Sequence, residues 1–127
     1  MALVLETATR NALADALDDY VNSGSAPELV FETTGDVEVA TIVLNATAAF
    51  GAASTGTITL ADVPLSDTNS TGGTVAQFSI YINASQTGKV LEGTVSTSGA
   101  DINLTSLVIA ATETVTLSSF TITVPAS

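Results

Sequence analysis

From Pro27 onward the sequence is a succession of short segments rich in Thr, Val and Ile, each bounded by residues that favour turns. Several segments alternate apolar and polar residues, as strands do when one face of a sheet is buried. No stretch long enough for a crossover helix separates any two of them, which argues against parallel βαβ units. The predicted strands are residues 28–34, 37–44, 57–63, 76–83, 89–95, 102–110 and 114–124.

This pattern predicts a mainly β protein, an antiparallel β-sandwich or jelly-roll-like barrel preceded by one N-terminal α-helix. A chain of 127 residues is long enough to bury one core without disulfides or metals. We divide it into an N-terminal arm with an amphipathic helix, residues 1–24, and a β-sandwich domain, residues 25–127.

Two details of the strand pattern lead to specific predictions. Residues 76–83 alternate most clearly, and their polar members Gln77 and Ser79 are predicted to face solvent on a half-buried strand. In the last segment Leu117 and Phe120 are out of phase with each other, so we expect a bulge or kink between them.

Before the strands begin, only residues 7–22 carry a helical period. Their apolar side chains recur on one side, and the polar side chains opposite are predicted to face water. The apolar stripe consists of Leu13, Leu17, Tyr20 and Val21, and the polar side of Asn11, Asp15, Asp18 and Asn22. The stripe needs a covering surface, which is either the protein's own sheet or a neighbouring subunit.

The first residues of the chain and the helix together form the candidate interaction site. Leu3 and Leu5 would form a sheet-edge strand or lie on another protein. Arg10 either pairs with Glu6, one helical turn before it, or meets an acidic group on a partner. The predicted partner or oligomer contacts are Leu3, Leu5, Arg10, Leu13, Leu17, Tyr20 and Val21.

The sequence has no histidine and no cysteine, and only two cationic side chains against thirteen carboxylates. It therefore lacks an imidazole base, a thiolate nucleophile and the usual ligands of soft metals. We predict a protein that is not an enzyme, without catalytic, cofactor-binding or metal-binding residues. An alternative is a calcium site between subunits, at Asp36 with Glu38 or at the loop residues Asp67 and Asp101.

The charge balance bears on the partners. A formal net charge of −11 repels phosphate backbones and anionic lipid headgroups, so we expect neither nucleic-acid nor membrane binding. The start of the chain has no basic flank, and no apolar run reaches the length of a membrane span. An intracellular origin is the expectation.

Stretches along almost the full length resemble small structural proteins from the virions of tailed bacteriophages, in which a short helix precedes a Thr-rich β-domain. They include RNALADA at 10–16, SGADINL at 98–104 and FTITVP at 120–125. The other matching stretches are 24–27, 49–51, 74–79 and 93–95. The resemblance implies a non-enzymatic component that decorates and stabilises the capsid exterior, a cement protein.

From this resemblance the expected partners are the major capsid protein and other copies of the chain, as a homo-oligomer whose expected form is a trimer. The expected location is the capsid surface of the virion, after synthesis in the cytoplasm of the host bacterium. Two other classes stay open. One is a tail, fibre or adaptor component of the phage, and the other is a carbohydrate-binding β-module.

Overall fold

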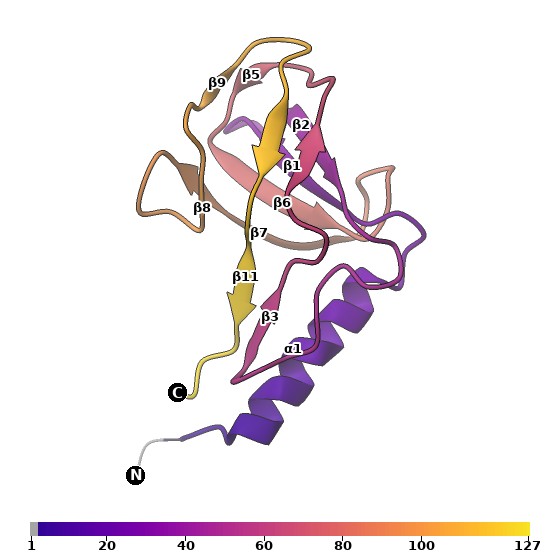
Figure 1. Cartoon of the computed structure of the whole chain (residues 1–127), viewed down its shortest axis with the longest axis vertical. Helices are drawn as coiled ribbons and strands as arrows, with labels where there is room; N and C mark the ends of the chain where they lie inside the picture. Colours follow the sequence, from indigo (N-terminus) through magenta and orange to yellow (C-terminus); the bar gives the residue numbers. More distant parts are fainter. Residues whose placement is uncertain (1–2) are drawn as a thin grey trace.

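The computed structural model describes residues 3–127, and over this range the chain is mainly β, with 36% of its residues in strands and 12% in one helix. The helix, α1 (Thr7–Val21), precedes all strands, as the sequence predicts (Figure 1). The strands are β1 (Glu28–Glu32), β2 (Glu38–Val43), β3 (Thr57–Thr59), β4 (Leu65–Asp67), β5 (Gly73–Thr74), β6 (Gln77–Tyr81), β7 (Lys89–Ser96), β8 (Ile102–Asn103), β9 (Val108–Ile109), β10 (Val115–Leu117) and β11 (Thr121–Thr123).

The largest element is a curled five-stranded sheet with the order β2-β1-β6-β7-β8. Its first three pairings are antiparallel, whereas β7 and β8 pair in parallel over two residues. Three two-stranded sheets complete the β part: β10 with β4, β11 with β3, and β5 with β9. The sheet is therefore antiparallel in all but one short contact.

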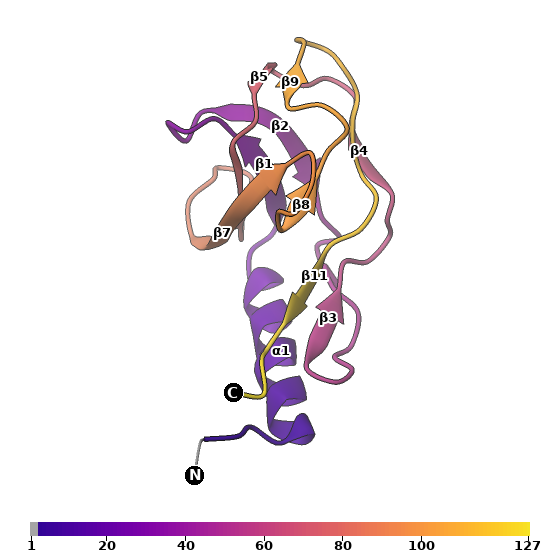
Figure 2. The same cartoon turned by 90° about the vertical axis from the view of Figure 1, so that its left-hand side faces the viewer.

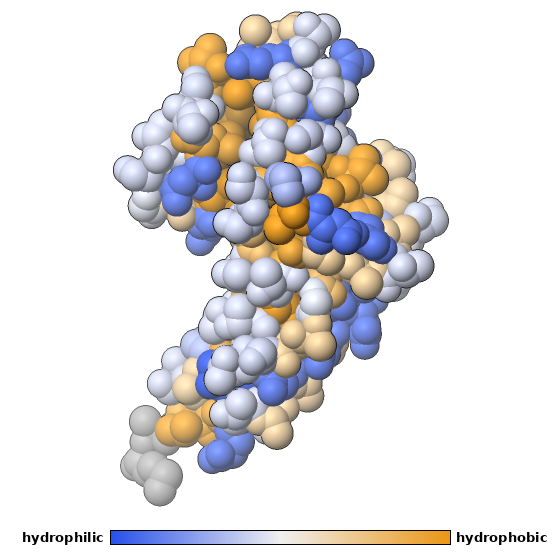
Figure 3. Space-filling view, viewed as in Figure 1, coloured by the Kyte–Doolittle hydropathy of each residue, from blue (hydrophilic) through white to orange (hydrophobic). Residues whose placement is uncertain are grey.

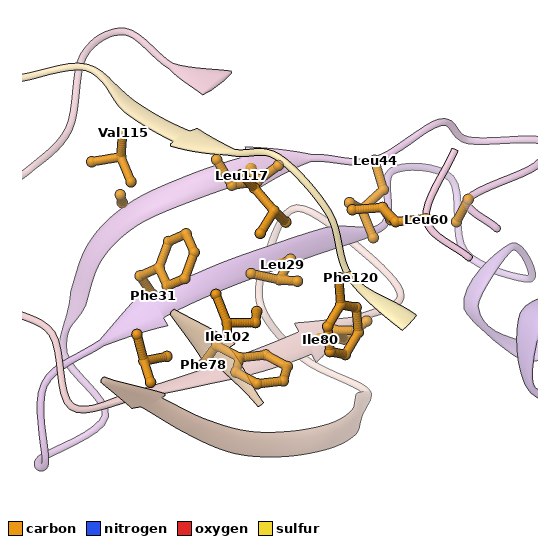
Figure 4. Packing of buried hydrophobic residues seen from close by; sticks show 14 of the residues in the cluster. Leu29, Phe31, Leu44, Leu60, Phe78, Ile80, Ile102, Val115, Leu117 and Phe120 are labelled. Atoms are coloured by element: carbon orange, nitrogen blue, oxygen red, sulfur yellow. The ribbon is translucent and has the colours of Figure 1, made fainter. Parts of the chain in front are cut away.

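The core lies between the five-stranded sheet and the C-terminal strands. Figure 4 shows Leu29 and Phe78 pointing from the sheet toward Leu117 and Phe120 on the opposite layer. The rings of Phe78 and Phe120 meet edge to face, with 5.2 Å between their centroids. Aromatic pairs of this geometry stabilise a core by about 0.5–1.5 kcal/mol beyond the area that they bury.

The segment 114–124 is interrupted where the phase of its apolar residues changes. Leu117 is buried at the end of β10, which pairs with β4, and Phe120 is buried just before β11, which pairs with β3. The two residues between them shift the alternation, and the strand changes partner at this point. The predicted irregularity is confirmed.

Strand β6 differs from its prediction. Ser79, expected to face water, is fully buried, as is its neighbour Ile80 on the other face of the sheet. The strand lies in the middle of the sheet, and on its polar face the Ser79 hydroxyl donates to the buried Glu32 carboxylate of β1. The prediction of a half-buried strand is therefore wrong.

The molecule is elongated, with a broad and a narrow end. Both views show the five-stranded sheet at the broad end and α1 beside the β3–β11 ribbon at the narrow end (Figures 1 and 2). The two ends of the described chain also lie at the narrow end, where the Leu5 N–H donates to the Ala126 carbonyl at 2.7 Å. The narrow end thus gathers the arm, the helix and the C-terminal residues.

Candidate interaction surface

The polar side of α1 faces the protein and not water. Its side-chain oxygens accept hydrogen bonds from backbone N–H groups of the loop between β2 and β3. The pairs are Gly56 to Asn11 at 2.7 Å, Ala53 to Asp15 at 2.8 Å, Phe50 to Asp18 at 3.0 Å and Ala49 to Asn22 at 3.0 Å. The prediction that these four helix residues mark the solvent side is wrong.

The reason lies in the loop that the helix contacts. Several backbone N–H groups in residues 49–56 lack a strand partner, and a buried N–H without an acceptor costs about 1–3 kcal/mol. Its small side chains allow the backbone to come close to the helix. The helix acts as a row of acceptors, and α1 is therefore packed against the rest of the chain.

Burial raises the pKa of the Asp18 carboxyl. The hydrogen bonds from Phe50 and Asn22 act in the opposite direction, and the nearby carboxylates Asp19 and Asp15 raise the pKa further. Desolvation is the largest of these effects, so the bonds within the protein only partly replace the water that Asp18 loses.

Arg10 is also used inside the molecule. Its Nε donates to the Val124 carbonyl at 2.9 Å and its Nη2 donates to the Thr55 carbonyl at 2.7 Å. The expected pair with Glu6 does not form in residues 3–127, where the ion pair present is Lys89 with Glu92. Through these hydrogen bonds Arg10 links α1 to the C-terminal segment and to the loop before β3.

The opposite side of α1 remains largely open to solvent. We define the outer helix face as Leu13, Ala16, Leu17 and Tyr20, which recur at the spacing of one face. Leu13 is 49% exposed and Tyr20 is 50% exposed, whereas Leu17 is half-buried against the core. In the arm before the helix, Leu3 is 82% exposed. The outer helix face is thus an apolar strip along α1, and Leu3 lies separately in the arm before the first turn of the helix.

The seven predicted contact residues thus divide into three groups. Leu3, Leu13 and Tyr20 are exposed and available to a partner. Leu5 and Leu17 are half-buried. The other two, Arg10 and Val21, make internal contacts, Val21 being fully buried in the core. Val21 therefore has no surface left for a partner, whereas a partner contact of the half-buried Arg10 stays a prediction.

The structure also contains a buried polar cluster that the sequence did not reveal. Glu32 is 1% exposed, and its carboxylate accepts hydrogen bonds from the Ser79 hydroxyl at 2.6 Å and the Tyr81 hydroxyl at 2.9 Å. Gln77 donates to the same carboxylate at 3.4 Å. These donors come from β6, the strand beside β1, so the cluster lies on the sheet face opposite the core.

A second carboxylate on this sheet face lacks such donors at one oxygen. Glu28 is 8% exposed, and its Oε1 is buried without a hydrogen-bond partner. Burial raises the pKa of Glu28, and the nearby Glu38 carboxylate raises it further, while a hydrogen bond from Gln86 acts the other way. Within residues 3–127, no group of three or more acidic side chains is arranged to hold a metal ion.

The carboxylates considered for calcium are engaged within the chain. Asp67 accepts from the Thr41 N–H, Asp101 accepts from Thr94, and Asp36 accepts from Gln77. Glu38 accepts from the Thr41 hydroxyl. Each of these four carboxylates therefore accepts a hydrogen bond from a group of the same chain.

Two hollows open on the surface of the β part. The larger, about 480 Å³, lies between residues 101–109 and 113–119 and is lined mainly by hydroxyl, amide and carboxyl side chains. No aromatic ring lines it, so it lacks the flat platform on which sugar rings stack. The smaller, about 290 Å³, lies between β7 and β11 and has Phe78 and Phe120 among its lining residues.

In the part of the chain that the structure describes, the single helix is too short to cross a lipid bilayer. No model of a protein family, no curated protein and no solved structure matches the chain. Among the described residues the most distinctive exposed feature is the outer helix face.

Proposed function

We propose that this chain is a non-enzymatic structural protein of a tailed-phage virion, which decorates the capsid exterior and stabilises it by binding the major capsid protein. The observation that carries the proposal is the outer helix face, where the apolar side chains of Leu13 and Tyr20 are about half-exposed. An apolar surface on an otherwise hydroxyl-rich protein favours a protein partner.

The contacts between α1 and the β part suit a protein that acts as a rigid scaffold. The hydrogen bonds from the loop 49–56 to α1, together with those of Arg10, fix the helix to the β part, so that its outer face is held in one orientation. A surface that is already ordered loses less entropy on binding, which favours affinity from a small footprint. Many weak contacts of this kind would reinforce a repeating lattice.

Charge limits the kind of surface that can receive the narrow end. The chain carries a net charge of −11, and the exposed Glu6 and Asp19 lie beside the apolar residues of the arm and the helix. A matching site on the major capsid protein has an apolar floor and a basic rim. Binding to this site should weaken as the salt concentration rises, because salt screens the attraction between the acidic residues of the narrow end and the basic rim of the site.

The test is binding of the purified protein to undecorated phage heads. We expect saturable binding in many copies per particle and a higher temperature of particle disruption. The double variant Leu13→Asp, Tyr20→Asp should lose binding while its own melting temperature stays close to that of the parent. The matched control is Val108→Asp, because Val108 is 68% exposed but lies at the broad end.

Two results would overturn the proposal. Location at the tail in a few copies per particle would favour the tail, fibre or adaptor class. Loss of head binding in the Val108 control as well as in the helix variant would place the contact elsewhere.

A further inference from the structure

Strand β7 has one edge that, over residues 89–94, no other strand covers within residues 3–127. On one side it pairs with β6 from Lys89 to Thr94, and on the other side it pairs with β8 only at Val95 and Ser96. The Thr94 N–H points to this second side, where it donates to the Asp101 carboxylate at 2.9 Å. Because backbone groups alternate between the two sides of a strand, the N–H and carbonyl of Glu92 point the same way.

Strand β11 has a similar edge. The Leu60 N–H donates to the Phe120 carbonyl and the Val124 N–H donates to the Gly56 carbonyl, so Phe120 and Val124 direct their backbone groups toward the β3 side. By the same alternation, Thr121 and Thr123 direct theirs away from β3. Among the described residues β3 is the strand that pairs with β11.

The smaller hollow lies between these two edges. Its volume is about 290 Å³, and it is lined by Glu92 and Gly93 on the β7 side and by Thr121 and Thr123 on the β11 side. The rest of the lining is apolar apart from the Asp101 carboxylate, and consists of Phe78, Leu91, Phe120, Ile122 and Asp101. Figure 3 shows apolar residues next to charged ones in the middle of this face. A hollow with backbone donors and acceptors beside an apolar floor is what an extended peptide requires.

The arm of the chain has the complementary properties. Leu3 is 82% exposed and Val4 is 61% exposed, although both are apolar. The segment 3–5 carries no charge, so it can approach another anionic copy with little repulsion. Glu6, which joins the arm to α1, already has an extended backbone, with φ −66° and ψ 154°. An extended segment loses little entropy when it becomes a strand.

We propose that residues 3–5 of one copy enter the hollow between β7 and β11 of a second copy and add a short strand to the free edge of β7. The copies then associate through exchange of their N-terminal arms. The inference rests on the homo-oligomer within the proposed function, but it concerns the isolated protein and needs no capsid.

The absence of cysteine makes cross-linking a direct test, because each introduced thiol is the only one in its chain. Two variants, Val4→Cys and Thr121→Cys, are mixed and oxidised, and we expect a disulfide-linked heterodimer. In the control mixture Val108→Cys replaces Thr121→Cys; this thiol is also exposed but lies at the broad end, and we expect few cross-links. Equal yields in the two mixtures would overturn the proposal.

Sedimentation equilibrium gives an independent measure. The double variant Leu3→Asp, Val4→Asp should weaken self-association at least about tenfold, since it places two charges where apolar side chains would be buried. The control Val37→Asp, Val108→Asp adds the same charges at equally exposed valines and should leave association unchanged. A parent chain that stays monomeric at all concentrations, or an oligomer insensitive to the arm variant, would contradict arm exchange.

The two proposals fail in different ways. A monomer that still binds phage heads contradicts arm exchange and supports the capsid proposal. An arm-linked oligomer that binds no heads supports arm exchange and contradicts the capsid proposal.

Discussion

The carboxylate of Asp15 accepts a hydrogen bond from the Ala53 backbone N–H, with 2.8 Å between Oδ1 and N. This contact joins the middle of α1 to a loop residue 38 positions later in the chain. It belongs to the row of four acceptors on the helix, and it shows that the polar side of α1 serves the interior of the molecule.

Replacement of Asp15 by Ala should lower the free energy of unfolding by about 1–3 kcal/mol, because the Ala53 N–H would lose its acceptor. Asp15→Asn keeps an oxygen at the same position and should cost less than half as much. Asp19→Ala, at an exposed position of the same helix, should change stability by less than about 0.5 kcal/mol. Urea denaturation of the three variants gives the comparison, and equal effects at positions 15 and 19 would contradict the assignment.

Tyr81→Phe should destabilise the protein by about 1–3 kcal/mol, because it removes a hydroxyl donor from the buried Glu32 carboxylate. Tyr20→Phe removes the same group at a half-exposed position and should be close to neutral. Calorimetric melting of both variants measures the difference. A neutral Tyr81→Phe would contradict the assignment of the Tyr81 hydroxyl as a stabilising donor to Glu32.

Glu28 should make the protein less stable as the pH rises. Folding raises the pKa of this carboxyl, mainly by burial, so the native state holds the proton more tightly than the unfolded chain does. The stability contributed by the protonated form is present in acid and is lost as the pH rises from the ordinary value through the raised native value.

Glu28→Gln removes this titration and should raise stability at neutral pH by about 1 kcal/mol. The gain should shrink as the pH falls from neutral through the raised native pKa toward the ordinary value of glutamate, as the parent becomes protonated. Thermal unfolding of the parent and the variant across this range provides the test, with the exposed Glu6→Gln as control. Parallel curves for the parent and Glu28→Gln would refute the expectation.

Gly56→Ala should cost more than Gly99→Ala, although both glycines have positive φ, +78° and +73°. A Cβ at position 56 would lie 2.8 Å from Nε of Arg10 and 2.9 Å from the Val124 carbonyl oxygen. At position 99 no atom lies within 4 Å. The backbone penalty of about 1 kcal/mol is common to both variants. The additional loss of stability in Gly56→Ala, measured by thermal melting, therefore reports the displaced Arg10 contacts.

Local patterns in the sequence predicted the longer strands but not all of the short ones. The single strand expected at residues 102–110 is two short strands, β8 and β9, and β4 and β5 were not predicted. Alternation and turn residues located β1, β2, β6 and β7 to within about two or three residues, and the phase change after Leu117 located the break between β10 and β11. These properties depend on neighbours within a few positions, which a sequence displays directly.

The orientation of α1 could not be predicted in the same way. Amphipathicity compares the side chains of the helix with one another, whereas the observed orientation depends on backbone N–H groups of residues 49–56 that need acceptors. The composition of that loop shows small residues but not which of its N–H groups lack partners. The burial of Glu32 was hidden for a related reason, since its donors Ser79 and Tyr81 become neighbours only when β1 pairs with β6.

The location of both chain ends at the narrow end has a practical consequence for engineering. A tag or fused domain at either end would crowd the arm and the outer helix face, and would confuse any binding assay. The turn at Ser98 and Gly99, exposed and with open space around Gly99, offers a place for an inserted peptide. If the narrow end binds a shell, an epitope inserted there would be displayed once per copy, away from the anchored side of the protein.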